Sequence, residues 1–289
     1  MKSRSAGKDI QYTMIVDFHT HCFPDALAPR AMQQLTKTIS SMHIFPSTDG
    51  TAAGLLQSMD AAHIDKSVVC HIATNAHQMH KVNDFAISQK STEHGRLIPL
   101  GSLHPHAEQL EEELTRLMQV GIPGLKLHPD YMGFDFDDPV YDRILSLCEE
   151  HGLFLITHAG FDPLSPEHMH CTPVMVRRVM ERHPALKLVV AHLGGMNCEE
   201  DTLSLLCGRD VYLDTSLLTH RPQKSAILHQ ILSSHAPERL LFATDTPWTD
   251  AKAEIEALER TPLSQDTKDM IFHKNAEALL ADCNPIKEV

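Results

Sequence analysis

The segment Val16-Asp-Phe-His-Thr-His21 is a short, mostly apolar run that ends in two histidines one residue apart. Alternate side chains of a strand point to the same face, so we expect Asp17, His19 and His21 to lie on one side of a strand. Imidazoles that converge in this way are common ligands of divalent metal ions. The segment therefore predicts a buried strand with a metal-binding pair at its end.

Histidine is abundant, at 21 of 289 residues, so pairs separated by one residue also arise by chance. Further examples are His104/His106 and His168/His170. Only the position of the first pair relative to the other apolar runs can decide whether it has a function.

Eight short apolar runs, each followed by a segment with helical periodicity, extend along the whole chain. We expect strands at Met14–Thr20, Ser67–Ala73, Leu97–Leu103, Gly124–His128, Leu153–His158, Leu186–His192, Val211–Thr215 and Leu240–Thr244. Repeated strand–helix units form parallel sheets, and eight of them suit a closed (β/α)₈ TIM barrel. The sequence therefore predicts an α/β fold of this class.

The helical segments include 108–119, 140–151, 173–182 and 251–259, where apolar residues recur three or four positions apart. Residues 26–62 are expected to add a helical insertion after the first strand, as two helices around a turn at 46–51. We expect residues 1–13, which are mostly polar, to be a disordered extension, and residues 14–289 to form a single domain.

The formal net charge of -13 disfavours nucleic acid and anionic membranes as partners, because both attract positive charge. No long apolar run predicts a membrane span or a signal peptide, so we expect a cytoplasmic protein that acts on a small molecule. The seven cysteines have no paired spacing and are expected to be reduced and mostly buried. A homodimer stays open as the oligomeric state.

Other apolar runs also end in a histidine or an aspartate. The fifth run ends in His158, the sixth in His192 and the eighth in Asp245. Catalytic groups of such barrels come from the carboxyl ends of several strands, so these residues should meet His19 and His21 at one mouth. Three or four nitrogen and oxygen ligands suit a catalytic zinc ion.

The chain resembles the amidohydrolase superfamily, in particular its amidohydrolase-related (type 2) branch, which includes amino-carboxymuconate-semialdehyde decarboxylase-like enzymes. The similarity covers nearly the whole chain after Met14. The motifs that carry it are Asp-Phe-His19-Thr-His21, Gly124-Leu-Lys126-Leu-His128-Pro, Ile-Thr-His158-Ala-Gly, Val-Ala-His192-Leu-Gly-Gly195, Tyr-Leu-Asp214-Thr-Ser and Ala-Thr-Asp245-Thr-Pro-Trp248.

The resemblance implies that His19, His21, His158 and Asp245 bind one divalent metal ion, with Zn²⁺ as the first expectation and Mn²⁺ as the alternative. It also implies that His192 lies close to a water molecule on the metal, so His192 and Asp245 are the expected catalytic groups. Some superfamily members carboxylate a strand-four lysine to bridge two metals. For this chain we expect Lys126 to hold a substrate carboxylate.

Further residues are expected to contact substrate. Strand alternation places Lys126 and His128 on one face, and Arg30, Trp248 and Tyr131 lie in loops expected over the same mouth. Further structural residues are also expected: Asp214 as a cap of the turn after the seventh strand, and His71 and His104 as hydrogen-bonded histidines outside the metal shell.

Several functions are compatible with these residues. We expect a metal-dependent hydrolase that uses a metal-activated water on an amide, ester or lactone, with a carboxylate-bearing substrate. The alternative is a non-oxidative decarboxylase of an unsaturated or aromatic acid. Two others stay open: a zinc-binding protein without catalysis, and a metal-dependent deoxyribonuclease, whose fourth strand normally supplies a Glu where this chain has Lys126.

Overall fold

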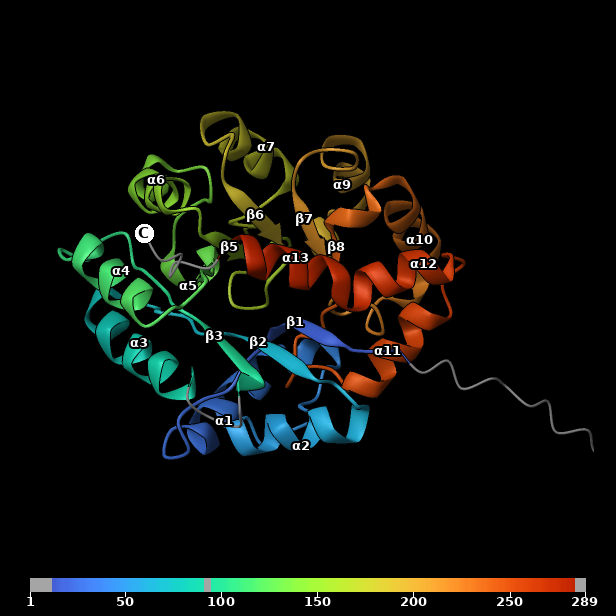
Figure 1. Ribbon diagram of the computed structural model, residues 1–289, viewed down its shortest axis with the longest axis horizontal. Coiled ribbons are helices and arrows are strands. Elements are labelled where there is room, and N and C mark those ends of the chain that lie inside the picture. Colours follow the sequence, from blue (N-terminus) through green and yellow to red (C-terminus); the bar gives the residue numbers. More distant parts are fainter. Residues whose placement is uncertain (1–11, 91–94, 284–289) are drawn as a thin grey trace, which may run out of the picture.

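The computed structural model describes residues 12–90 and 95–283. Eight parallel strands alternate with helices, as the sequence predicts, and each coincides with an expected run to within a few residues. The strands are β1 (Val16–Thr20), β2 (Lys66–Cys70), β3 (Leu97–Leu100), β4 (Gly124–Leu127), β5 (Phe154–Thr157), β6 (Lys187–Val190), β7 (Tyr212–Asp214) and β8 (Leu240–Leu241). Figure 1 shows them as a ring inside a layer of helices, so the (β/α)₈ barrel is confirmed.

The ring consists of two arcs, β1-β2-β3 and β4-β5-β6-β7-β8. One seam joins β3 to β4, where the Gly101 amide donates to Gly124 (3.1 Å) and the Lys126 amide to Gly101 (2.8 Å). At the other seam, between β8 and β1, the Asp245 amide donates to the carbonyl of His19 (2.8 Å). Main-chain bonds thus close the barrel and hold Asp245 beside the histidine pair.

The main helices are α1 (Ala28–Ile39), α2 (Ala52–Ala62), α3 (Ala76–Lys90), α4 (Leu110–Gln119), α5 (Pro129–Met132), α6 (Asp142–His151), α7 (Pro173–Arg182), α9 (Glu199–Leu205), α10 (Ser225–Ser234), α11 (Ala251–Glu259), α12 (Gln265–Asp269) and α13 (Asn275–Asp282). Two helices, α1 and α2, lie between β1 and β2, where two were expected. The segment α8 (Ala191–Gly194) is a tight turn, because His192 and Leu193 have positive φ angles.

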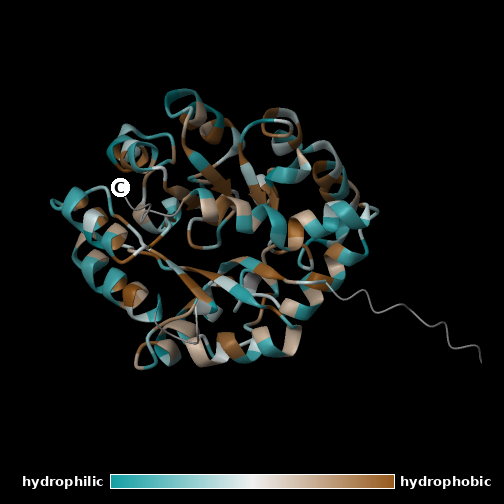
Figure 2. Cartoon of the chain, in the orientation of Figure 1, coloured by the Kyte–Doolittle hydropathy of each residue, from teal (hydrophilic) through white to brown (hydrophobic). Residues whose placement is uncertain are grey.

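The strands bury both of their faces. Residues such as Val69, Leu125 and Leu188 pack among the surrounding helices. Val16 and Ile156 instead belong to a second cluster that α13 completes from below. Figure 2 accordingly shows hydrophobic strands inside helices of mixed polarity, and Figure 1 shows α13 lying across the ring. The opposite, carboxyl end of the barrel is left for a functional site.

The segments outside the barrel core are few. The expected disorder of residues 1–13 falls largely on residues 1–11, which lie outside the described residues, while the Tyr12 ring packs against Phe272 with 4.2 Å between centroids. None of the seven cysteines, all within the described part of the chain, forms a disulfide. Six of them are buried, as expected.

Candidate metal centre and active site

A cavity of about 700 Å³ opens at the carboxyl ends of the strands. Its floor is formed by residues of β1, β2 and β4 and by residues that follow β5, β6 and β8, and its walls by α1 and the loops. The expected site residues that line it are His19, His21, Lys126, His128, Tyr131, His158, His192, Asp245 and Trp248. Strand ends far apart in the sequence therefore do converge.

A register shift in β1 decides which of its side chains face this cavity. The pairing of β1 with β2 shifts between Asp17 and Thr20, so one residue of β1 is unmatched and the alternation of side chains is interrupted. His19 and His21 both line the cavity. Asp17 instead accepts hydrogen bonds from the amide (3.0 Å) and hydroxyl (2.6 Å) of Thr244. The expectation that all three side chains share one face was therefore wrong for Asp17.

The orientation of His19 is fixed by two buried partners. Its Nδ1 donates to Oδ2 of Asp214 at 2.8 Å, which leaves Nε2 as an unprotonated acceptor. Nζ of Lys126, a fully buried residue, lies 3.1 Å from that Nε2. Asp214 was expected only to cap a turn. It does so, through the Ser216 amide (3.1 Å), but it also sets the tautomer of His19.

Nε2 of His21 and Oδ1 of Asp245 are two acceptor atoms that face each other. Nδ1 of His21 must donate to the carbonyl of Cys70 at 2.7 Å, so in the neutral imidazole, the form that binds metals, its Nε2 carries the lone pair. That Nε2 lies 3.1 Å from Oδ1 of Asp245, and Nε2 of His19 lies 3.5 Å from the same oxygen. Three lone pairs so close together call for a cation. Ligands of a tetrahedral Zn²⁺ lie about 2.0–2.1 Å from the ion and hence roughly 3.3 Å apart, which fits this arrangement.

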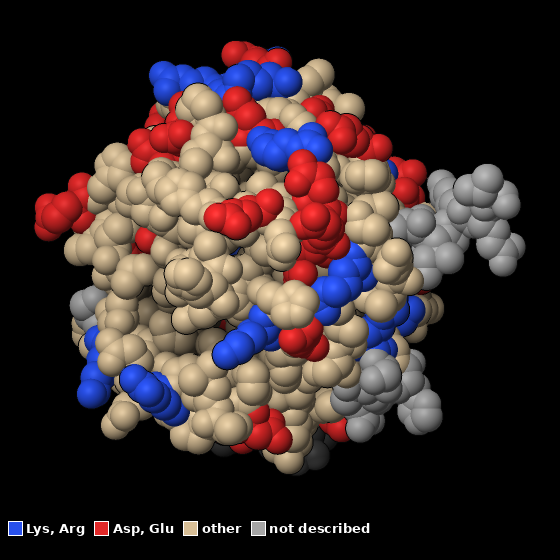
Figure 3. Space-filling view, turned by 90° about the vertical axis from the view of Figure 1, so that its left-hand side faces the viewer, with Lys and Arg blue, Asp and Glu red and all other residues tan. Residues whose placement is uncertain are grey.

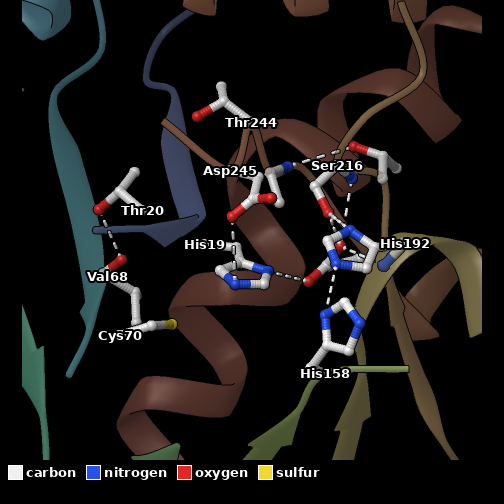
Figure 4. A network of polar contacts seen from close by, with 12 residues as sticks. His19, Thr20, Val68, Cys70, His158, His192, Ser216, Thr244 and Asp245 are labelled. Atoms are coloured by element: carbon white, nitrogen blue, oxygen red, sulfur yellow. Dashed lines mark hydrogen bonds and ion pairs between the residues drawn. The ribbon is translucent and has the colours of Figure 1, made fainter. Parts of the chain in front are cut away.

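A chain of hydrogen bonds fixes the protons on the other histidines (Figure 4). The Ser216 hydroxyl donates to Asp214 (2.5 Å), so it must accept from Nδ1 of His192 (2.7 Å). Nε2 of His192 is then unprotonated and accepts from Nδ1 of His158 at 3.1 Å. This order of donors leaves Nε2 of His158 as a bare lone pair, and it is buried without a hydrogen-bond partner among the described residues.

His158 lies outside the set of three ligand atoms. His19, His21 and Asp245 offer atoms within 4.8 Å of one another, and His158 is not a member of that group. Its Nε2 instead faces two carboxylates, at 3.7 Å from Asp162 and 4.0 Å from Asp130. The structure thus brings together three of the four expected metal ligands.

Asp130 and Asp162 are site residues that sequence reasoning missed. Asp130 follows His128 by two residues, and Asp162 follows His158 by four, so nearness to a strand-end histidine was the available signal. Asp162 lines the cavity, and its Oδ2 lies 3.5 Å from Nε2 of His128. Burial, aided by the negative charge of Asp130, raises the pKa of Asp162 to about 6.

Burial keeps the imidazoles at the floor neutral. It lowers the pKa of His158 to about 3, aided by His192, and holds the pKa values of His19, His128 and His192 well below the ordinary value. For Asp245, burial acts to raise the pKa, but His19, His21 and Lys126 outweigh it and the pKa is lowered. Neutral imidazoles beside an ionised carboxylate are the forms that bind metals.

The other expected contacts are divided between the cavity and the surface. Trp248 and Tyr131 line the cavity, and so does His71. Arg30 lies exposed on α1, a helix that forms part of the cavity wall, but is not itself among the lining residues. An arginine at this position of an amphipathic helix points to water, where its charge is hydrated. His104 is buried away from the cavity lining.

No helix in the described part of the chain is long and apolar enough to cross a membrane. On the face shown in Figure 3, Lys and Arg side chains alternate with Asp and Glu and form no continuous basic band. This distribution offers no track for a nucleic-acid backbone on that face.

Several solved structures share the fold. A 5-carboxyvanillate decarboxylase from Sphingomonas paucimobilis matches with a TM-score of 0.69 and 17% identity, over 93% of this chain and 99% of its own. A dihydroxybenzoic acid decarboxylase from Polaromonas, solved with manganese and the inhibitor 2-nitroresorcinol, matches with a TM-score of 0.69 and 15% identity, over 93% and 97%. A protein from Pseudomonas putida proposed to be a 2-pyrone-4,6-dicarboxylic acid hydrolase matches with a TM-score of 0.66 and 19% identity, over 94% of this chain and 99% of its own. No curated protein matches the chain.

The family model described as amidohydrolase matches residues 16–281, from the first residue of β1 to the penultimate residue of α13. The matched range contains all eight strands of the barrel and every residue of the histidine and aspartate cluster at its mouth. On this match, and with this architecture, the chain belongs to the amidohydrolase family of enzymes.

Proposed function

We propose that this enzyme is a metal-dependent, non-oxidative decarboxylase of an unsaturated or aromatic acid. The observation that carries the proposal is Lys126, a fully buried lysine whose Nζ lies 3.1 Å from His19 Nε2 at the floor of the cavity. A buried cation needs an anionic partner, and Asp245, whose carboxylate interacts with Lys126, is also a proposed metal ligand. A metal ion held by His19 and Asp245 would take these partners from Lys126, and a substrate carboxylate would replace them.

The metal would be held by His19, His21 and Asp245, with His158 proposed as the fourth ligand because its Nε2 is a bare lone pair. A bound divalent ion would supply Lewis-acid polarisation of a substrate oxygen. Zn²⁺ suits these nitrogen and oxygen ligands, and Mn²⁺ is the alternative, since manganese is present in the Polaromonas decarboxylase.

The chain's own residues account for the remaining steps. Lys126 holds the substrate carboxylate, the bond between that carboxylate and the adjacent carbon breaks, and carbon dioxide leaves. The electron pair stays on the carbon, which takes a proton from a nearby acid. Asp162 is the proposed donor, because its pKa of about 6 leaves part of it protonated near neutrality. Its side chain is 15% exposed, so solvent can return the proton.

The size and character of the cavity indicate the rest of the substrate. A volume of about 700 Å³ is in the range of pockets for drug-sized ligands and far exceeds what a single benzoate ring fills. Leu27, Leu35 and Ile39 of the α1 region line the upper wall, together with Phe85 and Phe161. We propose that the acid carries a bulky apolar group that packs beneath α1.

Carbon dioxide release from a panel of aromatic and unsaturated acids, with and without large apolar substituents, tests the proposal. The Lys126→Met variant should retain its metal but lose turnover by at least 100-fold, while Lys66→Met, which removes an exposed lysine at the start of β2, should behave as the wild type. Full activity of Lys126→Met, or no carbon dioxide from any acid in the panel, would count against decarboxylation.

Hydrolysis of an ester, amide or lactone is the second candidate. It is favoured by the bare Nε2 of His158, which is able to accept a proton from water, and by the Pseudomonas putida neighbour. Isotopes separate the two reactions. Hydrolysis in H₂¹⁸O places ¹⁸O in the product, whereas decarboxylation in D₂O places deuterium on the carbon that lost the carboxylate.

A further inference from the structure

A second cluster of metal-ligating side chains lies outside the cavity. Asp135 follows α5, and His168 and His170 lie in the loop between β5 and α7. None of the three is among the residues that line the cavity. Their ligand atoms lie within 4.8 Å of one another, so the set meets the geometric requirement for holding one ion.

Both imidazoles point at the same carboxylate oxygen. Nε2 of His168 lies 2.6 Å and Nδ1 of His170 lies 3.0 Å from Oδ1 of Asp135. The two rings are nearly perpendicular, at 78°, with 4.5 Å between their centroids. Two ring nitrogens and one oxygen therefore converge from different directions, as ligands around a single ion do. In the absence of an ion, two imidazole protons occupy the space between them.

The main chain holds this arrangement in place before any ion binds. The Phe136 amide, next to Asp135, donates to the carbonyl of His170 at 2.7 Å, and the His168 amide donates to Ser165 at 3.0 Å. The Asp137 carboxylate, two residues from Asp135, accepts from Arg178 of α7 at 2.8 Å. A preorganised site loses little conformational entropy when it binds a ligand.

The ligand set selects a class of ion. Two imidazoles and one carboxylate suit Zn²⁺, Ni²⁺ and Cu²⁺, whereas Ca²⁺ and Mg²⁺ prefer oxygen ligands. The His168 side chain is 54% exposed, Asp135 is 36% exposed and His170 17%, so water can complete the coordination.

We propose that Asp135, His168 and His170 form a second metal site, which takes a transition-metal ion such as Zn²⁺ and fastens the β5–α7 loop to the segment after α5. The same loop carries Phe161 and Asp162 on the cavity wall, and the Ser165 hydroxyl donates to Asp130 beneath it. An ion at this surface site therefore restrains a wall of the active site without touching substrate.

Zn²⁺ titration by calorimetry, with metal content measured by mass spectrometry, tests this site on the full chain. The His168→Ala/His170→Ala variant should bind one Zn²⁺ ion fewer than the wild type. Asp135→Asn should lower the affinity for that ion at least 10-fold. His151→Ala, which removes an exposed histidine at the end of α6, is the matched control and should leave the titration unchanged.

A second pair of variants separates this site from the cavity. His19→Ala/His21→Ala should retain the surface equivalent, and adding Zn²⁺ to it should slow hydrogen exchange of residues 161–171. If the cavity site of the proposed function binds no metal at all, the wild type should still bind one Zn²⁺ ion at the surface site. The His168→Ala/His170→Ala variant should then bind none. An unchanged Zn²⁺ stoichiometry in a folded His168→Ala/His170→Ala variant, shown by circular dichroism, would overturn the proposal.

Discussion

At the scale of single residues, Asp214 determines which nitrogen of His19 is available. Its Oδ2 accepts from Nδ1 of His19 at 2.8 Å and thereby leaves Nε2 for a metal ion. Asp214→Asn keeps the shape but removes the charge that orients the ring, so metal affinity should fall about 10–100-fold. Competition with a chromophoric chelator measures the change.

The control for this variant is Asp210→Asn, which alters an aspartate that is 76% exposed at the surface. It should bind metal as tightly as the wild type. Equal affinity in Asp214→Asn and Asp210→Asn would show that the bond to His19 has no part in metal binding.

At the scale of elements, Gly160 sets how closely the β5 and β6 loops approach each other. It has a φ of +84°, and an added Cβ would lie 2.1 Å from the amide nitrogen and 2.2 Å from the carbonyl oxygen of Met196. Backbone atoms cannot move aside as flexible side chains do. Gly160→Ala should therefore lower the free energy of unfolding by about 3 kcal/mol or more.

Gly133 provides the matched comparison, because its φ is +77° but no atom lies within 4 Å of an added Cβ. Gly133→Ala should lower the free energy of unfolding only by the strain of a left-handed backbone, about 1–2 kcal/mol. Urea unfolding of both variants gives the two values. A loss for Gly160→Ala no greater than that for Gly133→Ala would mean that the two loops separate without cost.

The strands show how far sequence alone reaches at this scale. Apolar runs bounded by turn residues identified all eight, because burial on two faces leaves a clear hydrophobic signal. The register shift in β1 has no such signal, since it depends on how Asp17 and Thr20 pair with β2. The partners of Asp17 therefore came only from the structure.

At the scale of the whole molecule, buried histidines should control stability against pH. Burial lowers the pKa values of several of them, so below about pH 6.5 the unfolded chain binds protons that the fold excludes. They include His19, His71, His128, His158 and His192. Each such group contributes about 1.4 kcal/mol per pH unit, and this stability is present above pH 6.5 and lost on acidification.

Carboxyls with raised pKa values act in the opposite direction, and besides Asp162 two fully buried ones do so most strongly. Burial raises the pKa values of Asp17 and Glu254 to about 7, so their contribution is greatest at low pH and is lost as pH rises toward 7. Because the histidines outnumber them, the metal-free protein should unfold at a lower urea concentration at pH 5 than at pH 7. Glu254→Gln, which removes one opposing group, should make this dependence steeper. A midpoint independent of pH would contradict the assignment of neutral histidines.

The site as a whole was only partly accessible from the sequence. Strand-end positions identified His19, His21, His192 and Asp245, because a barrel brings these ends to one mouth. The place of Asp162 in the site depends on distances of a few ångströms between loops and strands, which residue types do not encode. The exposed position of Arg30 likewise depends on how α1 lies over the cavity.

The two seams of the barrel divide it into two unequal arcs of strands, and both arcs contribute residues to the candidate metal centre. The arc β1-β2-β3 supplies His19 and His21, and the arc β4 to β8 supplies Lys126 and Asp245. If the chain were cut between β3 and β4, a metal ion bound by residues of both fragments would hold the two fragments together. Association of separately expressed fragments 1–105 and 106–289 should then depend on metal, and indifference to a chelator would show that the apolar contacts alone reunite them.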